Sequence, residues 1–296
     1  EKYLKELIEW CEESDGEFTP SDFPDGSVEE NVLGSINKNN PNLKNVYVFP
    51  SAGGLMGGCR KFSHDLSHLA NFYCLQIPDL FTDNVSKSID SLVEYFVNIV
   101  KKEQKTGELY ILGWSFGGIL AYKVAWELNQ IGFEVKYVGM IDSWLKHYRE
   151  TNSKWWVSFE KHIEKEKFAG LRDDVSISKI IRLIENNVIH LAGNNKDNVR
   201  RFVTWAHTLH KILKDLEFKK SNLYVDLYKA NNSIGFIKGM SLDQKNELYD
   251  LDKYTSNFQK IITLDGRHGE LFKKRNWKIN RQQFEERLSE VLKGKF

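Results

Sequence analysis

Short apolar runs alternate with longer amphipathic stretches over residues 46–143. The runs are rich in β-branched and aromatic side chains, which is typical of buried strands. Between them, apolar residues recur every three or four positions, which is typical of helices that cover a sheet. The predicted strands are 46–49, 72–77, 108–112 and 135–141, and the predicted helices cover 89–100 and 119–128.

The same alternation returns near the end of the chain. Residues 223–228 and 260–264 are predicted strands, and Phe284, Leu288 and Val291 lie on one face of a final helix. An edge strand is expected over 32–36. Strands that alternate with helices favour an α/β fold with a mostly parallel, doubly wound sheet.

Helical patterns replace the alternation between Trp144 and Ser221. Helices inserted between a strand and the next strand commonly cap an active site. An ordinary helical subdomain would have the same pattern. At the other end of the chain, two prolines in Phe18–Pro24 exclude a regular element and indicate a linker or strap.

The strongest chemical motif is Gly113-Trp114-Ser115-Phe116-Gly117. It lies between a predicted strand and a predicted helix, the context that turns G-x-S-x-G into a nucleophile elbow. The glycines allow close packing around a strained serine, and the helix that follows directs its amides at the same place. The sequence therefore predicts that Ser115 is a nucleophile.

A serine hydroxyl needs a base, and a neutral imidazole suits that role. Of the eight histidines, His268 follows the last predicted strand in a glycine-flanked loop, so we expect it to be the base. His64 with His68, and His207 with His210, have spacings that can ligate a metal. Neither pair has an evident third ligand, and no metal site is expected.

The third catalytic member must be a carboxylate that orients the imidazole. Asp142 directly follows a predicted strand one strand-and-helix unit after the serine, and it is the favoured acid. Asp226 lies in the middle of a strand, too far from the carboxyl edge. Asp265 is a rival because it is close to the base in sequence, although it is better suited to shaping the loop.

A small-residue loop, Pro50 to Gly54, follows the strand 46–49. It lacks both G-x-G-x-x-G and G-K-[ST], so a phosphate-binding role is not favoured. We interpret it as an oxyanion-hole loop, in which the amide of Ala52 pairs with the amide of Phe116.

The composition removes several other classes of function. The 42 basic and 41 acidic residues give a net charge of +1, so no overall basic field would recruit nucleic acid. The three cysteines form no disulfide or metal pattern, which suits a reducing compartment. No apolar run is long enough to span a membrane and no signal peptide opens the chain. We therefore expect a soluble, cytoplasmic protein that binds neither nucleic acid nor membrane.

Taken together, FPSAGG, LQIPDL, LYILGWSFGGILAYKVAWEL and VGMIDSW resemble the terminating (type I) thioesterase domains of nonribosomal peptide synthetases. These are α/β-hydrolases with an inserted helical lid. The resemblance implies a thioesterase domain over 25–296, with a core of 25–143 and 222–296 and a lid of 144–221. The family often has proline where Ser51 stands and an acidic residue where Arg267 stands, which leaves the electrostatics beside the base open.

The run Thr19 to Pro24 also resembles the end of condensation and epimerisation domains, so residues 1–24 are expected to be the tail of such a domain or a linker. The chain opens on Glu1 rather than methionine, which likewise suggests a piece of a larger synthetase.

The resemblance implies release of a peptidyl or acyl chain through a Ser115 acyl-enzyme, by hydrolysis or macrocyclisation. A carrier domain would present the substrate on its phosphopantetheine arm, and the domain would need no cofactor of its own. One alternative is a stand-alone editing thioesterase or esterase. Another is a hydrolase-fold binding module without activity, which the presence of Ser115, Asp142 and His268 disfavours.

Overall fold

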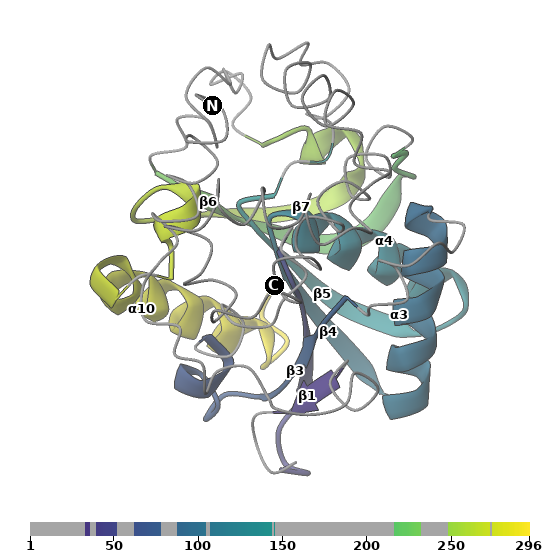
Figure 1. Cartoon of the computed structure of the whole chain (residues 1–296), viewed down its shortest axis with the longest axis horizontal. Helices are drawn as coiled ribbons and strands as arrows, with labels where there is room; N and C mark the ends of the chain where they lie inside the picture. Colours follow the sequence, from purple (N-terminus) through teal and green to yellow (C-terminus); the bar gives the residue numbers. More distant parts are fainter. Residues whose placement is uncertain are drawn as a thin grey trace, which may run out of the picture.

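A seven-stranded sheet forms the centre of the computed structural model (Figure 1). The structure describes residues 33–35, 40–51, 62–77, 88–104, 107–143, 145, 216–231, 248–272 and 274–296. The strands are β1 (Leu33–Ser35), β2 (Asn45–Phe49), β3 (Asn71–Leu75), β4 (Glu108–Trp114), β5 (Glu134–Ile141), β6 (Ser221–Ala230) and β7 (Thr255–Leu264). Their order across the sheet is β1-β3-β2-β4-β5-β6-β7.

The strands from β3 across to β7 all pair in parallel, and β1 pairs antiparallel with β3 at one edge. From β2 the chain moves outward to β3, and then returns to build β4 to β7 on the other side. The strand order therefore reverses between β2 and β4, the place where open α/β sheets bind ligands beyond the carboxyl ends of their strands. The predicted α/β fold with a mostly parallel, doubly wound sheet is confirmed.

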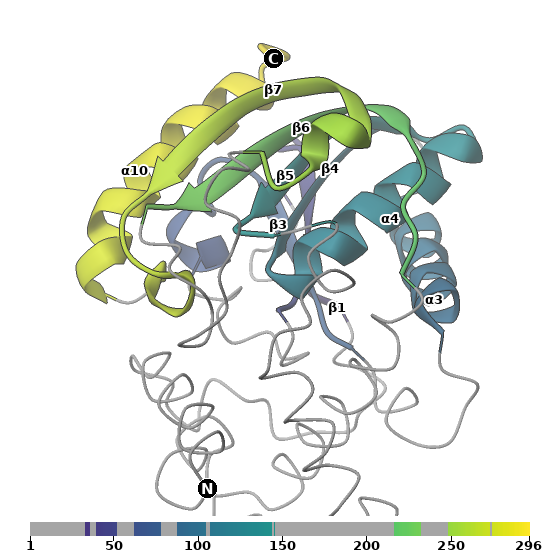
Figure 2. The same cartoon turned by 90° about the horizontal axis from the view of Figure 1, so that it is seen from above.

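Helices cover both faces of the sheet (Figures 1 and 2). Helices α3 (Ile89–Glu103) and α4 (Phe116–Gln130) lie on one face, and α10 (Lys274–Val291) lies on the other. Each face has its own apolar core. Alternate residues of a strand point to opposite faces, so Tyr47 joins the core under α3 and α4, while Val46 joins the core under α10.

Local sequence explains where helix α3 begins. Its N-cap is Ser88, whose hydroxyl accepts a hydrogen bond from the Ser91 amide at 3.1 Å. The Ser91 hydroxyl in turn accepts from the Ser88 amide at 3.2 Å, which completes a capping box. The apolar stripe that predicted this helix is buried.

Several strand boundaries differ from the prediction by one or two residues, and the start of β7 differs by five. Strand β3 ends at Leu75, two residues before the predicted Ile77. Strand β7 begins at Thr255, five residues before the predicted Lys260. Polar residues precede Lys260, but β7 is an edge strand, and an edge strand can keep polar side chains in water.

Most of the expected domain divisions cannot be compared with the structure. The expected tail (1–24) lies outside the described residues, and so does all of the expected lid (144–221) except residues 145 and 216–221. Leu216, which the helical pattern included, lies in a segment without regular structure that leads into β6.

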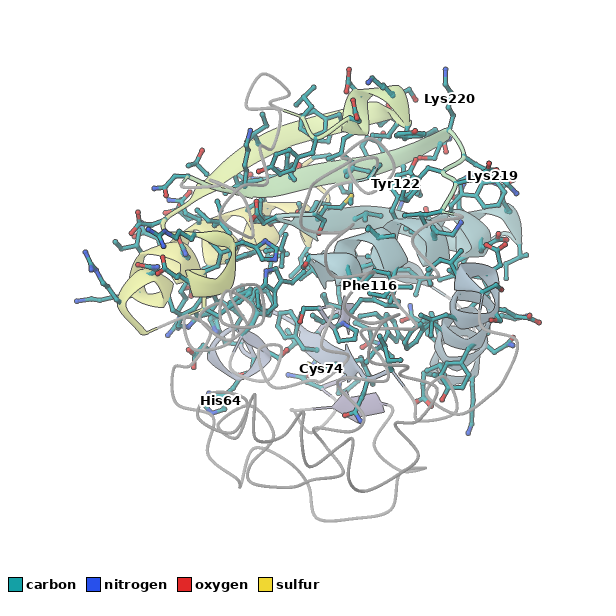
Figure 3. The ribbon with its side chains drawn as sticks, turned by 45° about the horizontal axis from the view of Figure 1, so that its top comes forward. His64, Cys74, Phe116, Tyr122, Lys219 and Lys220 are labelled. Atoms are coloured by element: carbon teal, nitrogen blue, oxygen red, sulfur yellow. The ribbon has the colours of Figure 1, made fainter. Side chains whose placement is uncertain are left out.

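Helix α4 holds this entering segment in place. The Tyr122 hydroxyl lies 3.1 Å from the Lys219 carbonyl, and the Trp126 indole N–H donates to the Lys220 carbonyl at 3.3 Å. The Lys219 ammonium lies 4.2 Å from the centre of the Trp126 ring. Figure 3 labels Tyr122, which belongs to α4, and Lys219 and Lys220 of the segment that the helix holds.

Candidate active site

Ser115 occupies the sharp turn between β4 and α4. Its backbone has φ 57° and ψ −123°, a conformation that is strained for any residue with a side chain. The turn is held on both sides, because the Ser115 amide donates to the Ile141 carbonyl at 2.9 Å and the Gly118 amide donates to the Ser115 carbonyl at 3.0 Å. The predicted strand, turn and helix are thus present.

The glycines beside Ser115 are required by close backbone packing. A Cβ atom on Gly113 would lie 2.0 Å from the Gly117 carbonyl oxygen. A Cβ on Gly117 would lie 2.4 Å from the Phe49 carbonyl oxygen and 2.5 Å from that of Pro50. The end of β2 therefore packs directly against the first turn of α4, and side chains at Gly113 and Gly117 would push these segments apart.

The Ser115 side chain is buried, and its Oγ makes no hydrogen bond with any described residue. The indole N–H of the neighbouring Trp114 is also buried and unpaired among the residues that the structure describes. A buried polar atom without a partner is costly, and such atoms often mark places where a ligand binds. Helix α4 begins at Phe116, so the positive end of its dipole lies beside the serine.

Asp142 follows β5 directly and is fully buried. Its backbone has φ 45°, and its amide donates to the Tyr228 carbonyl at 2.6 Å. Its carboxylate Oδ2 lies 2.7 Å from Nδ1 of His268. A carboxylate can only accept, so this distance favours the imidazole tautomer with the proton on Nδ1.

His268 begins the short 3-10 helix η5 (His268–Glu270), which follows β7. The loop before it turns at Gly266 (φ 104°), and both backbone groups of Asp265 are bonded to the Asn280 side chain of α10. The His268 side chain is buried, with its ring centre 5.6 Å from that of Trp114. Trp114 directly precedes Ser115, so this contact brings His268 to the elbow.

Comparison with known proteins decides the family. A family model described as "Thioesterase domain" matches residues 44–215, which is more than half of the chain. The chain belongs to this family of thioesterase domains. Membership implies hydrolase chemistry, and it confirms the resemblance on which the sequence interpretation rested.

Relatives of this thioesterase domain are large synthetases. It is 44% identical over 55 residues to atromentin synthetase of Tapinella panuoides, a match that covers 19% of this chain and 6% of that protein. It is 24% identical over 164 residues to N-(5-amino-5-carboxypentanoyl)-L-cysteinyl-D-valine synthase of Amycolatopsis lactamdurans, which covers 53% of this chain and 4% of that synthase. The chain thus spans a small fraction of the curated relatives it matches.

Among solved structures, the Vlm2 thioesterase domain bound with a dodecadepsipeptide has a TM-score of 0.63 at 16% identity. The alignment covers 86% of this chain and 97% of the Vlm2 domain. At this identity the likeness establishes the fold alone, and it confirms the predicted α/β-hydrolase architecture.

The two predicted oxyanion residues and the two carboxylates weighed against Asp142 need separate comment. Ala52 lies outside the described residues, and Phe116 is at the expected place as the first residue of α4. The rival Asp265 has a carboxylate that accepts from the Asn231 amide group at 2.9 Å. Asp226, set aside because of its mid-strand position, accepts from Arg287 Nε at 2.6 Å inside the core.

The remaining histidines do not form a metal centre in the described part of the chain, where no cluster of three or more potential ligands occurs. His64 Nδ1 lies 3.1 Å from Asp65, and His68 Nε2 lies 2.6 Å from Glu285. His207 and His210 lie outside the described residues.

Among the helices that the structure describes, none is long and apolar enough to cross a membrane.

Two residues near the site were not found from the sequence. Trp114 was recognised only as a variable position in the elbow motif, and its ring contact with His268 depends on how β4 and β7 end. Tyr249 donates from its hydroxyl to Asp142 Oδ1 at 3.2 Å. No motif surrounds Tyr249, so no sequence signal indicated it.

Proposed function

We propose that this thioesterase domain releases a peptidyl or acyl chain from a carrier domain through an acyl-enzyme on Ser115. The observation that carries the proposal is the 2.7 Å contact between Asp142 and His268, which adjoins a serine held in a strained elbow. Side-chain exposures of 6% and 0% for His268 and Asp142 keep water from competing for this contact. The family assignment adds the thioester as the bond to be cleaved.

In the first half-reaction, Ser115 Oγ bonds to the thioester carbonyl carbon and its proton passes to Nε2 of His268. Asp142 keeps the other ring nitrogen protonated and stabilises the imidazolium that forms. The carbon–sulfur bond then breaks, and the imidazolium returns the proton to the leaving thiolate. Catalytic hydrogen bonds are often completed only when substrate is bound, so we expect Ser115 Oγ to reach His268 in that state.

The negative oxygen of the tetrahedral intermediate needs donors. The amide of Phe116, at the positive end of α4, is one candidate, and the amide of Ala52 is the other. The close approach of Gly117 to the carbonyls of Phe49 and Pro50 supports this, because it places the loop that leads to Ala52 against the helix start. Each such donor contributes about 3 kcal/mol to the transition state.

In the second half-reaction, His268 takes a proton from a nucleophile that attacks the ester carbonyl of the acyl-enzyme. Water gives a free acid, whereas an amine or hydroxyl of the bound acyl chain gives a lactam or lactone. Ser115 recovers its proton from the imidazolium in either case. Hydrolysis and macrocyclisation therefore use the same residues of the protein, and they differ in which nucleophile attacks the acyl-enzyme.

The proposed substrate arrives on a partner. We infer that a carrier domain of the same synthetase presents the acyl chain on a phosphopantetheine arm, so the thioesterase domain needs no cofactor of its own. A likeness to a four-domain nonribosomal peptide synthetase supports this setting: the TM-score is 0.68 at 17% identity, and the match covers 86% of this chain and 20% of that synthetase.

Intact-mass measurement with a peptidyl-pantetheine thioester tests the proposal. Wild-type protein should gain the mass of the acyl group, and Ser115→Ala should gain none and lose turnover by about 10⁶-fold if the three residues act as a unit. Ser63→Ala is a matched control, because Ser63 is also buried but its hydroxyl contacts Cys74 at 3.0 Å, away from the elbow. It should acylate like wild type.

The released product distinguishes the outcomes, since a hydrolysed chain is heavier than its cyclic form by one water. Equal turnover of carrier-bound and small free thioesters would favour a stand-alone editing thioesterase or esterase. Adduct formation on Ser115→Ala, or none on wild type with several unrelated acyl chains, would contradict the acyl-enzyme.

A further inference from the structure

The Asp142 carboxylate is held by more than the imidazole. Its Oδ2 contacts His268, while Oδ1 accepts two other hydrogen bonds, from the Ala230 amide at 3.2 Å and from the Tyr249 hydroxyl at 3.2 Å. We propose that Tyr249 is a positioning residue that fixes the Asp142 carboxylate for its contact with His268. This inference rests on the proposed function, in which Asp142 orients the base.

The geometry gives Tyr249 a specific task. Two donors on Oδ1 prevent rotation of the carboxylate about its Cβ–Cγ bond and leave Oδ2 for the imidazole. Hydrogen bonds from neutral donors also stabilise the ionised form of a buried carboxylate. Ala230 is part of β6, the strand next to β5, and Tyr249 lies in the segment that leads to β7, so the acid at the end of β5 is tied to two later parts of the chain.

The backbone that delivers Tyr249 is strained. Tyr249 has φ 51° and the next residue, Asp250, has φ 64°, so two successive side chains are in the left-handed region that favours glycine. Such conformations persist only where the surroundings impose them, and they gather at functional sites. Here Leu251 donates to the Leu248 carbonyl at 3.0 Å, and Asp250 pairs with Lys253 across the turn.

The ring of Tyr249 is also placed by its surroundings. It is 6% exposed and belongs to the apolar core on the α4 face of the sheet. The Lys229 ammonium lies 4.7 Å from the centre of the ring. A cation over an aromatic ring is attracted to its face, so Lys229 helps to hold the ring of Tyr249 in place.

Tyr249→Phe is the direct test, because it keeps the ring and removes only the hydroxyl. The probe is a short alkyl fluorophosphonate, which phosphonylates an activated serine with loss of fluoride and does not require the natural chain. We expect labelling of Ser115 to be about 10-fold slower in Tyr249→Phe, the effect of losing a hydrogen bond to a charged group. An unchanged labelling rate would overturn the inference.

A double-mutant comparison separates positioning from general destabilisation. If Tyr249 acts through Asp142, Tyr249→Phe should slow labelling little further in an Asp142→Asn background. An equal 10-fold loss in both backgrounds would mean that Tyr249 acts elsewhere. Tyr137→Phe is the matched control, since its hydroxyl donates to another buried carboxylate, Asp226, at 2.8 Å. It should lower stability and leave the labelling rate unchanged.

A spectroscopic measurement keeps this test independent of the proposed function. In protein with ¹⁵N-labelled histidine, the proton on Nδ1 of His268 reports the hydrogen bond to Asp142. Tyr249→Phe should shift this resonance and Tyr137→Phe should not; a resonance that does not move in Tyr249→Phe refutes the positioning role. If wild type shows no labelling while the resonance still shifts, the acyl-enzyme fails and the positioning of Asp142 stands.

Discussion

The Trp114 and His268 rings lie with their centres 5.6 Å apart and their planes tilted by 32°. Trp114 also contacts Phe272 edge-on at 5.1 Å, so its indole is packed between the base and the segment that follows it. The residue next to the proposed nucleophile thus holds the proposed base in place, although the two are far apart in the sequence.

This contact predicts the effect of shortening Trp114. An aromatic pair contributes about 0.5–1.5 kcal/mol beyond its buried area, so Trp114→Leu should slow acylation of Ser115 by about 3–10-fold. Trp114→Phe keeps an aromatic ring against the imidazole and should retain most of the rate. Both rates can be measured with the fluorophosphonate probe. Equal losses in the two variants would show that the ring contact does not matter.

The choice of acid predicts unequal effects of two carboxylate substitutions. Asp142→Asn should lower turnover by about 10⁴-fold, because an amide at this position favours the wrong imidazole tautomer. Asp265→Asn should have a small effect, since the Asp265 carboxylate is bonded to Asn231. Steady-state hydrolysis of an acyl thioester measures both. A larger loss in Asp265→Asn would transfer the role of the acid to that residue.

The packing of α4 against the end of β5 predicts a rescue. A Cβ on Gly118 would lie 2.0 Å from the Ser143 hydroxyl oxygen and 2.5 Å from its Cβ. Gly118→Ala should therefore lower the free energy of unfolding by about 1–3 kcal/mol, the usual cost of overpacking. Ser143→Gly removes the obstructing atoms, so the double variant should be more stable than the sum of the single effects predicts. Urea unfolding measures this coupling, and strict additivity would contradict the proposed clash.

Buried tyrosines predict a loss of stability at high pH. Burial, with the neighbouring Asp226 charge, raises the pKa of Tyr137 and of Tyr228 well above the usual value. The folded protein keeps these protons, whereas the unfolded chain releases them near pH 10. Above about pH 10 the unfolded state binds fewer protons, so the free energy of unfolding should fall as pH rises.

Urea unfolding between about pH 8 and about pH 11 tests this dependence. Tyr137→Phe removes one of the two hydroxyls that lie 2.9 Å apart and should flatten the alkaline slope, although it starts from lower stability. A slope equal to that of wild type would show that the Tyr137 hydroxyl titrates normally in the folded protein.

Local pattern alone was enough to predict most of the fold. Runs such as Val46–Phe49 and Leu109–Leu112 are apolar enough to be buried on both faces. Continuous apolar runs of this kind are typical of strands in a parallel sheet that helices cover on both sides. The elbow is equally local, because Gly113, Ser115 and Gly117 are close in sequence and their steric needs arise within one turn. The predicted start of β7 was wrong because it also used only local pattern. The polar residues near Asn257 do not indicate which strand will lie at the edge of the sheet.

The surroundings of the site depended on tertiary structure. The order of residues along the chain favoured Asp142 over Asp265. Only the pairing of β5, β6 and β7 brings the Asp142 carboxylate to a distance of 2.7 Å from Nδ1 of His268. The same strand order brings Trp114 to that imidazole and Tyr249 to that carboxylate. Side-chain period and turn chemistry act over a few residues, whereas these contacts join segments that meet only when the sheet is assembled. The sequence therefore determined which groups could react, and the assembled sheet determined which groups hold them in place.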